Sequence, residues 1–251
     1  MTRRPYIRSV GDERERGTDT ETAAKGEMPA RPSGEAAEPL PCDPPTLTGA
    51  GGQGPSGAHN PAQPGASPGP ATILTPERFA RLFPRVPMES QERYRAAVVA
   101  SCERFGINTP ERIAAFLAQV SHESGGLLFL QEIWGATPAQ ERYETRSDLG
   151  NVLSGDGYRF RGRGPLQITG RYNYARAGAA LGLPLESEPE LLAEIENGMA
   201  AAAWFWARAN LNELADHGAF DRITRTINGG LNGLPDRIRR WNKARVILGL
   251  L

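Results

Sequence analysis

Cysteine is nearly absent from this chain of 251 residues, which contains only Cys42 and Cys102. Small secreted domains held together by disulfides carry several cysteine pairs at regular spacing, and no such pattern is present. Cys42 lies in a segment rich in proline and glycine, whereas Cys102 lies in a segment with helical spacing of apolar residues. We therefore expect both thiols to be free.

An excess of one charge and long apolar runs are also missing. The 29 basic side chains balance the 29 acidic ones, whereas nucleic-acid-binding domains are usually strongly basic, so we expect no nucleic-acid partner. The longest apolar runs are far too short to span a bilayer, and none follows Thr2, Arg3 and Arg4 at the start. We expect neither membrane insertion nor a signal peptide.

Histidine is scarce as well, with only His59, His122 and His217. A helical zinc-protease motif needs a second histidine four residues after the first, but position 126, four residues after His122, is glycine. We therefore expect no metal and no other cofactor.

Proline and glycine are concentrated at one end of the chain. Residues 1–70 hold 12 of the 21 prolines, 11 of the 29 glycines and one aromatic residue, Tyr6. Such a composition cannot bury enough apolar surface to offset the entropy lost on ordering. We predict a disordered tail and linker over 1–71, either without a function or serving as a tether or delivery segment, and one folded domain over 72–251.

The folded part has mostly helical patterns. Thr75-Pro76-Glu77 and Thr109-Pro110-Glu111 are typical of helix starts, with threonine as N-cap and proline at the first position. Residues 135–165 are rich in glycine and polar residues, which indicates loops with a short hairpin at most. Further helices are predicted over 89–105, 191–209, 220–227 and 235–248.

Glu123 follows the apolar stripe of one predicted helix. It lies seven residues after Phe116 and three after Val120, which places it on the same face as these two residues. A carboxyl group that loses its hydration there holds its proton more tightly, as a general acid must. The alternative is a carboxylate that only caps or pairs locally at the end of the helix.

Two glycine-containing motifs stand out. The first is His122-Glu123-Ser124-Gly125-Gly126, and the second contains Arg161-Gly162-Arg163-Gly164-Pro165-Leu166-Gln167-Ile168-Thr169 followed by Asn173-Tyr174. Both resemble motifs of family 19 glycoside hydrolases, which comprise chitinases and related phage endolysins. A third piece, Ile227-Asn228-Gly229-Gly230, resembles a late turn of that family. The resemblance covers about residues 73–251. It implies a mainly α fold of the α+β lysozyme-like type, with a small loop or hairpin region beside the cleft.

The resemblance also implies roles for single residues. Glu123 matches the general acid, Glu132 the general base of the shorter members, and Thr169 the hydroxyl residue that helps to hold the attacking water. The residues that match the substrate-binding positions are His122, Arg163, Gln167, Tyr172, Asn173 and Asn228.

Glycosidic cleavage by inversion needs an acid and a base about 6.5–9.5 Å apart, with a water between them. Glu132 lies nine residues after Glu123, beyond a Gly-Gly break, and the alternative for Glu132 is a plain surface carboxylate. The other acidic residues that compete for the role of base are Glu141, Glu144, Asp148 and Asp156.

Arginines accompany the glycines in the second motif. Arg161 and Arg163 are either surface charges or, as we expect, one of them pairs with Glu132 and keeps it ionised while Glu123 stays protonated. The last predicted helix is basic as well. Its cations, which form either a solvated face or a surface that attracts an anionic wall, are Arg237, Arg239, Arg240, Lys243 and Arg245.

The first functional hypothesis is a monomeric lysin that hydrolyses the glycan of bacterial peptidoglycan. It would be made in the cytoplasm without a signal peptide and would reach the cell wall through a holin or a secretion system. The second hypothesis is a chitinase, which the motifs do not separate from the first. The third is an inactive sugar-binding module, against which the retained Glu123, Glu132 and Thr169 argue.

Overall fold

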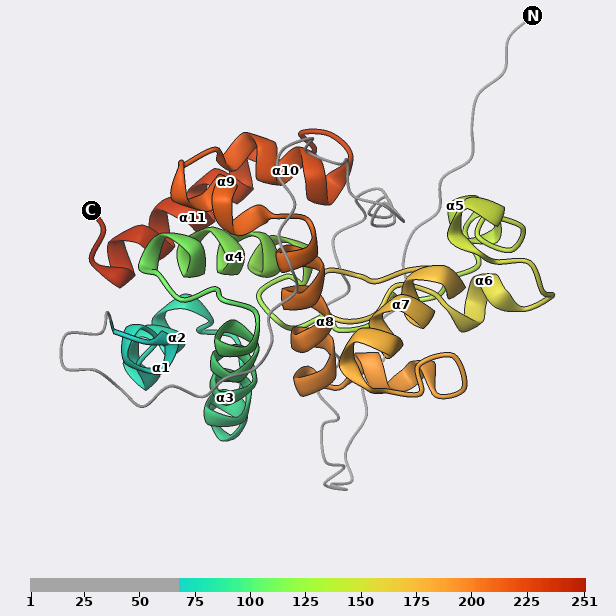
Figure 1. The fold of residues 1–251 in the computed structure, drawn as a ribbon, viewed down its shortest axis with the longest axis horizontal. Helices are drawn as coiled ribbons and strands as arrows, with labels where there is room; N and C mark the ends of the chain where they lie inside the picture. The colour runs from blue at the N-terminus through green and yellow to red at the C-terminus, as the bar shows by residue number, and fades with distance from the viewer. Residues whose placement is uncertain (1–67) are drawn as a thin grey trace, which may run out of the picture. The chain divides into compact units, whose positions relative to one another are not determined.

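The computed structural model describes residues 68–251. The predicted tail lies outside these residues apart from its last four positions, and so does Cys42. The described chain is helical, and its only β-pairings are isolated bridges (Figure 1). The α-helices are α1 (Pro70–Ile73), α2 (Pro76–Leu82), α3 (Met88–Arg104), α4 (Pro110–Glu123), α5 (Pro138–Glu141), α6 (Asp156–Arg159), α7 (Arg171–Leu181), α8 (Ile195–Arg208), α9 (Leu211–Asp216), α10 (Phe220–Asn228) and α11 (Leu234–Leu248). Two 3-10 helices, η1 (Ser147–Leu149) and η2 (Pro189–Ala193), complete them.

The predicted helix starts are confirmed. The side chain of Thr75 accepts a hydrogen bond from the Arg78 amide at 3.3 Å, and that of Thr109 accepts one from the Arg112 amide at 3.2 Å. Each threonine thus satisfies one of the amides that a helix start leaves without a partner, which stabilises the helix by about 1 kcal/mol. The long predicted helices 89–105, 220–227 and 235–248 correspond to α3, α10 and α11 within one residue at each end.

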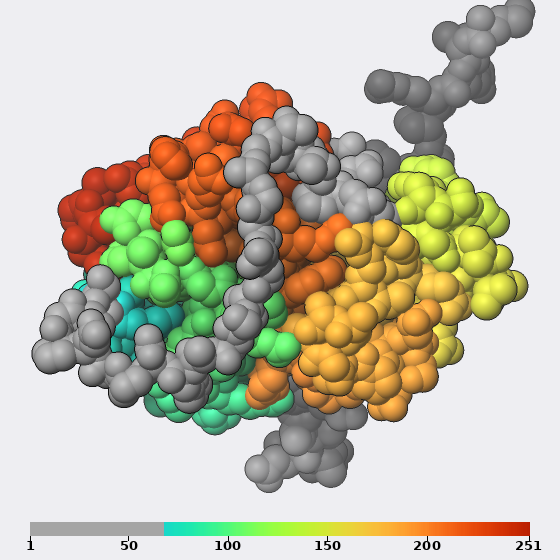
Figure 2. Space-filling view, in the orientation of Figure 1, coloured from blue at the N-terminus to red at the C-terminus, as the bar shows by residue number. Residues whose placement is uncertain are grey.

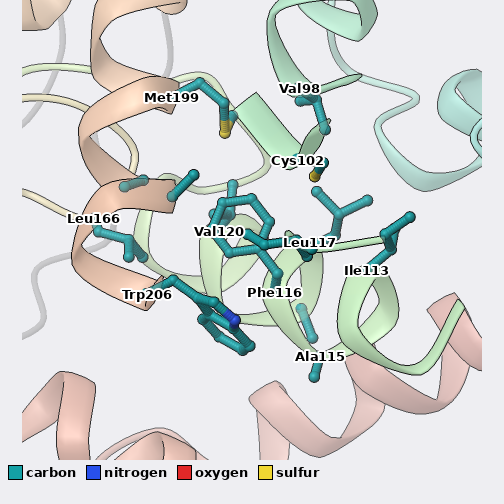
Figure 3. Close-up of a cluster of buried hydrophobic side chains, with 14 of the residues drawn as sticks. Val98, Cys102, Ile113, Ala115, Phe116, Leu117, Val120, Leu166, Met199 and Trp206 are labelled. Atoms are coloured by element: carbon teal, nitrogen blue, oxygen red, sulfur yellow. The ribbon is translucent and has the colours of Figure 1, made fainter. Parts of the chain in front are cut away.

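Helix α4 lies at the centre of the core, with ten of its 14 residues buried. It packs against α11, and α3 packs against α8. In Figure 3 Phe116 and Val120 of α4 lie among side chains of α3 and α8, and Phe116 meets Trp206 edge to face at 5.3 Å between ring centroids. The last turn of α4 is therefore held rigidly from several sides.

Residues 131–181 contain the β-bridges and several short helices. Arg163 forms antiparallel bridges with both Gln131 and Ile168. The predicted short hairpin is thus reduced to these two isolated bridges. The region expected to be loops also contains α5, η1 and α6. Helix α7 was missed because its buried positions include Asn173 and Gly178 rather than a stripe of large apolar residues.

Cys102 is a free thiol buried in the core, as expected. Burial raises the pKa of this thiol well above its usual range, which makes it unreactive at neutral pH. Across residues 68–251 no helix combines the length and the apolar composition that crossing a bilayer requires.

Candidate active site

The chain reverses sharply after Glu123, the last residue of α4. Gly125, Gly126 and Leu127 follow with φ angles of 61°, 81° and 67°, three successive left-handed conformations. The Ser124 hydroxyl donates to the Val120 carbonyl at 2.6 Å and accepts from the Leu127 amide at 2.8 Å. A branched residue such as Leu127 rarely adopts a positive φ, and such strain is typical of functional sites.

Glu123 is buried, with 6% of its surface exposed, and is paired with an arginine from the last helix. Arg237 Nη2 donates to Glu123 Oε1 at 2.5 Å, and Nη1 of the same guanidinium donates to Gln119 Oε1 at 2.5 Å. Arg237 Nε donates to the Asn232 carbonyl at 3.1 Å. Burial of Glu123 confirms the helical-face prediction, but Arg237, expected on a solvated or wall-facing surface, is 1% exposed and holds the carboxylate in place.

A second pair between α4 and α11 lies next to the first. In this pair the basic group comes from α4 and the acidic group from α11. His122 Nδ1 and Asp236 Oδ2 are 2.6 Å apart, and Asp236 also accepts hydrogen bonds from Arg240 and Arg239. Burial and the nearby charge of Arg237 lower the pKa of His122, although Asp236 acts in the opposite sense. Burial opposes ionisation of Asp236, but its hydrogen bonds with Arg240 and His122 lower its pKa to about 2. His122, predicted to bind substrate, therefore makes a structural contact as well.

We predict that the pH dependence of stability reports on His122. Its lowered pKa means that the unfolded chain binds a proton near the ordinary histidine pKa while the folded chain does not, so stability falls as the pH drops below about 6.5 towards the folded pKa. Urea unfolding at pH 7.5 and 5.5 should show a larger loss for the wild type than for His122→Asn. An equal loss in both proteins would contradict the assignment.

Gly233 at the start of α11 leaves room for the His122 ring. Its φ is +70°, and an added Cβ would lie 2.5 Å from His122 Cε1. We expect Gly233→Ala to destabilise the protein by about 1–3 kcal/mol, through strain at the positive φ and displacement of the imidazole.

Gly249→Ala is the matched control for Gly233→Ala. Gly249 has a φ of +82° but no neighbour within 4 Å of an added Cβ, so its substitution introduces only the backbone strain. Denaturant unfolding of both variants isolates the contribution of the clash, and equal losses of stability would show that the His122 contact does not matter.

Glu132 is oriented by a backbone pair and by a glutamine. Its amide donates to the Gly162 carbonyl at 2.8 Å, and its Oε2 accepts from the Gly162 amide at 3.0 Å. Its Oε1 accepts from Gln140 Nε2 at 3.0 Å, and this amide group also donates to the Ile133 carbonyl at 2.9 Å. Both carboxylate oxygens thus act as acceptors of neutral donors.

The expected pairing of Glu132 with Arg161 or Arg163 is wrong, because neither arginine is within ion-pair distance of it. Arg161 Nη1 donates to the Tyr158 carbonyl at 2.9 Å, and Arg163 Nη1 donates to the Tyr174 hydroxyl at 2.8 Å. Nη1 of each arginine thus donates to a carbonyl or hydroxyl group of the protein rather than to Glu132. Arg163, predicted to bind substrate, is 3% exposed and fixes the hairpin region instead.

Gly162 is tightly enclosed. An added Cβ would lie 2.7 Å from Gln167 Oε1, while the backbone of Gly162 is already engaged by Glu132 on both sides. We expect Gly162→Ala to fold but to lose about tenfold in kcat, because small misplacements of a reacting group are costly. The control is Gly135→Ala, because an added Cβ at Gly135 has no neighbour within 4 Å. Equal kcat values for the two variants would show that Gly162 does not contribute to catalysis.

The remaining residues of the second motif lie in the loop before α7 (Gln167 and Thr169) and in the first turn of α7 (Tyr172 and Asn173). Thr169 Oγ1 donates to the Gln167 carbonyl at 2.9 Å, and Asn173 Nδ2 donates to the Thr169 carbonyl at 2.9 Å. Gln167 has a φ of 55° and donates from Nε2 to the Gly164 carbonyl at 2.9 Å. Tyr172 is 39% exposed. Hydrogen bonds thus join Gln167 and Thr169 of the loop to Asn173 at the start of α7.

Two contacts fix this loop against the helical core. Leu166 enters the buried cluster that also contains Val120, one turn before the end of α4 (Figure 3). The backbones of Gly164 and Gly198 touch, since a Cβ on Gly198 would lie 2.9 Å from Gly164 Cα. The loop is therefore anchored to α8 and packs beside the last turns of α4.

Asn228, the last residue of α10, connects the third motif to the same region. Its Oδ1 accepts from the Asn232 amide at 3.2 Å, and the Asn232 carbonyl accepts from Arg237. The turn between α10 and α11 is thus bonded to the arginine that holds Glu123.

Two of the competing acidic residues show no sign of a catalytic arrangement. Glu144 accepts hydrogen bonds from the amides of Gly155 and Gly157, which hold a loop, and Glu141 is exposed.

The other two competitors are paired with arginines. Asp148 pairs with Arg146 at 2.6 Å and Asp156 with Arg171 at 2.5 Å, and these hydrogen bonds lower the pKa of each carboxyl group. The arrangement favours Glu132 as the base.

Between residues 68 and 251, no three His, Cys, Asp or Glu side chains gather closely enough to hold a metal ion.

Comparisons with known proteins place the sequence among glycosidases. The profile described as class I chitinase, glycosyl hydrolase family 19, matches residues 98–224. A family 19 domain-containing protein of Haemophilus influenzae is 32% identical over 201 residues, which cover 69% of this chain and 96% of that protein. An Arabidopsis thaliana endochitinase is 37% identical over 168 residues, or 64% of this chain and 57% of that protein. The chain spans about half the length of the plant chitinases it matches.

Solved structures show the same fold. Chitinase C of Streptomyces griseus aligns with a TM-score of 0.58 and 25% identity, over 75% of this chain and 80% of that one. A class IV chitinase of Zea mays aligns with a TM-score of 0.56 and 24% identity, over 70% of this chain and 92% of that one.

Proposed function

The chain belongs to glycoside hydrolase family 19 and is a glycosidase, and from this premise we propose that it hydrolyses β-1,4 bonds of an N-acetylated amino-sugar polymer with inversion. Glu123 acts as the acid and Glu132 as the base. The observation that carries the proposal is that hydrogen bonds hold the carboxyl groups of both matched residues in fixed positions. Glu123 is buried beside Arg237, while Glu132 accepts hydrogen bonds from Gly162 and Gln140.

The proposed reaction uses one proton donor and one proton acceptor. Protonated Glu123 gives its proton to the glycosidic oxygen as the bond to the anomeric carbon breaks. Arg237 stabilises the carboxylate that remains, because a buried charge needs a partner. Glu132 takes a proton from a water that attacks the anomeric carbon from the opposite face, and the Thr169 hydroxyl helps to hold this water.

Chitin is the first substrate candidate. The plant relatives are named endochitinases, and the fold is that of solved chitinases. Chitin is a β-1,4 polymer of N-acetylated amino sugars, which is the class of bond that the proposed acid and base would cleave. This reverses the order of preference that the sequence alone suggested.

Peptidoglycan is the second candidate, and a feature of α11 favours it. Lys243 and Arg245 carry positive charges without a carboxylate partner among residues 68–251. Cationic side chains on one helix would raise the local concentration of the protein at an anionic bacterial wall.

The substrate test compares two assays on the purified full chain. Release of reducing ends from chitin oligomers reports chitinase activity, and the fall in turbidity of purified bacterial walls reports peptidoglycan hydrolysis. NMR of the first product should show inverted anomeric configuration. Retention, or inactivity on both polymers, would contradict the proposal.

A further inference from the structure

Three aromatic side chains lie beside the proposed base. Trp134 follows Glu132 by two residues and meets Tyr158 edge to face at 5.3 Å and Tyr143 at 6.4 Å between ring centroids. The Arg161 guanidinium lies over the Tyr158 ring at 4.2 Å. Arg161 precedes Gly162, whose amide donates to Glu132. Trp134 and Tyr158 are thus connected to Glu132 in two ways. Trp134 follows Glu132 in the chain, and Tyr158 contacts Arg161, whose neighbour Gly162 donates to Glu132.

This region also carries much of the exposed apolar surface. Among the described residues, nine large hydrophobic side chains are exposed, and five of them fall between positions 133 and 172. Tyr158 is 51% and Ile133 63% exposed. The segment that contains α5 and α6, yellow in Figure 2, forms the outer end of the described residues. Exposed apolar patches beside an active site are typical of ligand-binding grooves.

Arg161 provides a second, independent observation. Its side chain is only 8% exposed, yet its Nε has no hydrogen-bond partner among the described residues. Buried donors in native proteins are nearly always bonded to protein or to ordered water. We therefore expect an oxygen of a water or a ligand to accept a hydrogen bond from this Nε. The guanidinium that carries it lies against the exposed Tyr158 ring.

We propose that Trp134, Tyr158 and Arg161 form an additional sugar-binding subsite beside Glu132. The apolar face of an N-acetylated pyranose lies against the Tyr158 ring, which Trp134 and Arg161 hold in place. The inference rests on the proposed function, since the polymer that reaches this subsite is the one cleaved between Glu123 and Glu132. Chains long enough to occupy the subsite then bind more tightly than short ones.

The test measures kcat and KM on short and long chito-oligosaccharides. We expect Tyr158→Ala to lower kcat/KM about tenfold on long oligomers, through KM, and to leave short oligomers unchanged. Tyr158→Phe keeps the ring and should retain wild-type values. Met88→Ala, which removes a side chain that is 89% exposed on α3, is the control. A change that is equal on short and long oligomers, or absent on both, overturns the subsite.

A binding experiment separates this inference from the proposed function. Titration of long oligomers into Glu123→Gln, followed by the fluorescence of tryptophan, measures Kd without turnover. A higher Kd on adding Tyr158→Ala supports the subsite even if the wild type hydrolyses neither polymer. An unchanged Kd overturns it, and leaves the proposed function standing if the wild type is active.

Discussion

Glu123→Gln is expected to lower kcat by about 10²- to 10⁴-fold while the protein stays folded, the usual contribution of a general acid. Glutamine has the same shape, and its amide oxygen can still accept a hydrogen bond from Arg237, which lies 2.5 Å from Glu123 Oε1 in the wild type. The amide, however, has no proton to give to the glycosidic oxygen. Reducing-end assays on chitin oligomers, with circular dichroism to check folding, measure the effect.

The matched control is Glu141→Gln, which makes the same chemical change at an exposed carboxylate in α5. It should retain wild-type kcat, so that a loss in Glu123→Gln cannot be attributed to a general change of charge. If Glu123→Gln hydrolyses at the wild-type rate, Glu123 is not the acid and the mechanism is wrong.

Arg237→Met is expected to destabilise the protein by about 3–5 kcal/mol, because it removes the arginine that pairs with a buried carboxyl group. The guanidinium is 1% exposed and bonds to Glu123, Gln119 and Asn232 at once. Methionine fills similar space but offers none of these donors. Urea unfolding gives the change in free energy directly.

The double variant Glu123→Gln with Arg237→Met tests where the cost arises. With the buried charge removed, the same arginine substitution should cost markedly less stability, and the difference gives the coupling energy between the two residues. Equal costs in both backgrounds would mean that Arg237 contributes through packing and its other bonds rather than through the ion pair.

Local patterns predicted much of the helical part. Thr109 before Pro110 gave a start for α4 that the structure confirms, and the spacing from Phe116 to Glu123 correctly predicted burial of the carboxyl group. These features depend on neighbours within a few turns, which the sequence places directly.

These local patterns did not predict which residues pair with Glu123 and Glu132. Arg237 lies 114 residues from Glu123, and nothing along α11 separates it from the four other cations that follow. For Glu132, the motif suggested an arginine, but the donors come from the Gly162 backbone and from Gln140. Which of several donors reaches a carboxylate depends on how distant segments pack, and the spacing of residues along one segment does not contain that information.

The two adjacent pairs between α4 and α11 have opposite polarity, His122 with Asp236 and Glu123 with Arg237. Sliding α11 along α4 or turning it about its axis would separate Asp236 from His122 and Arg237 from Glu123 at the same time. Mismatched alignments thus lose both contacts together. These two contacts fix how α11 packs on α4. The position of the Glu123 carboxyl group therefore depends on residues near the far end of the chain.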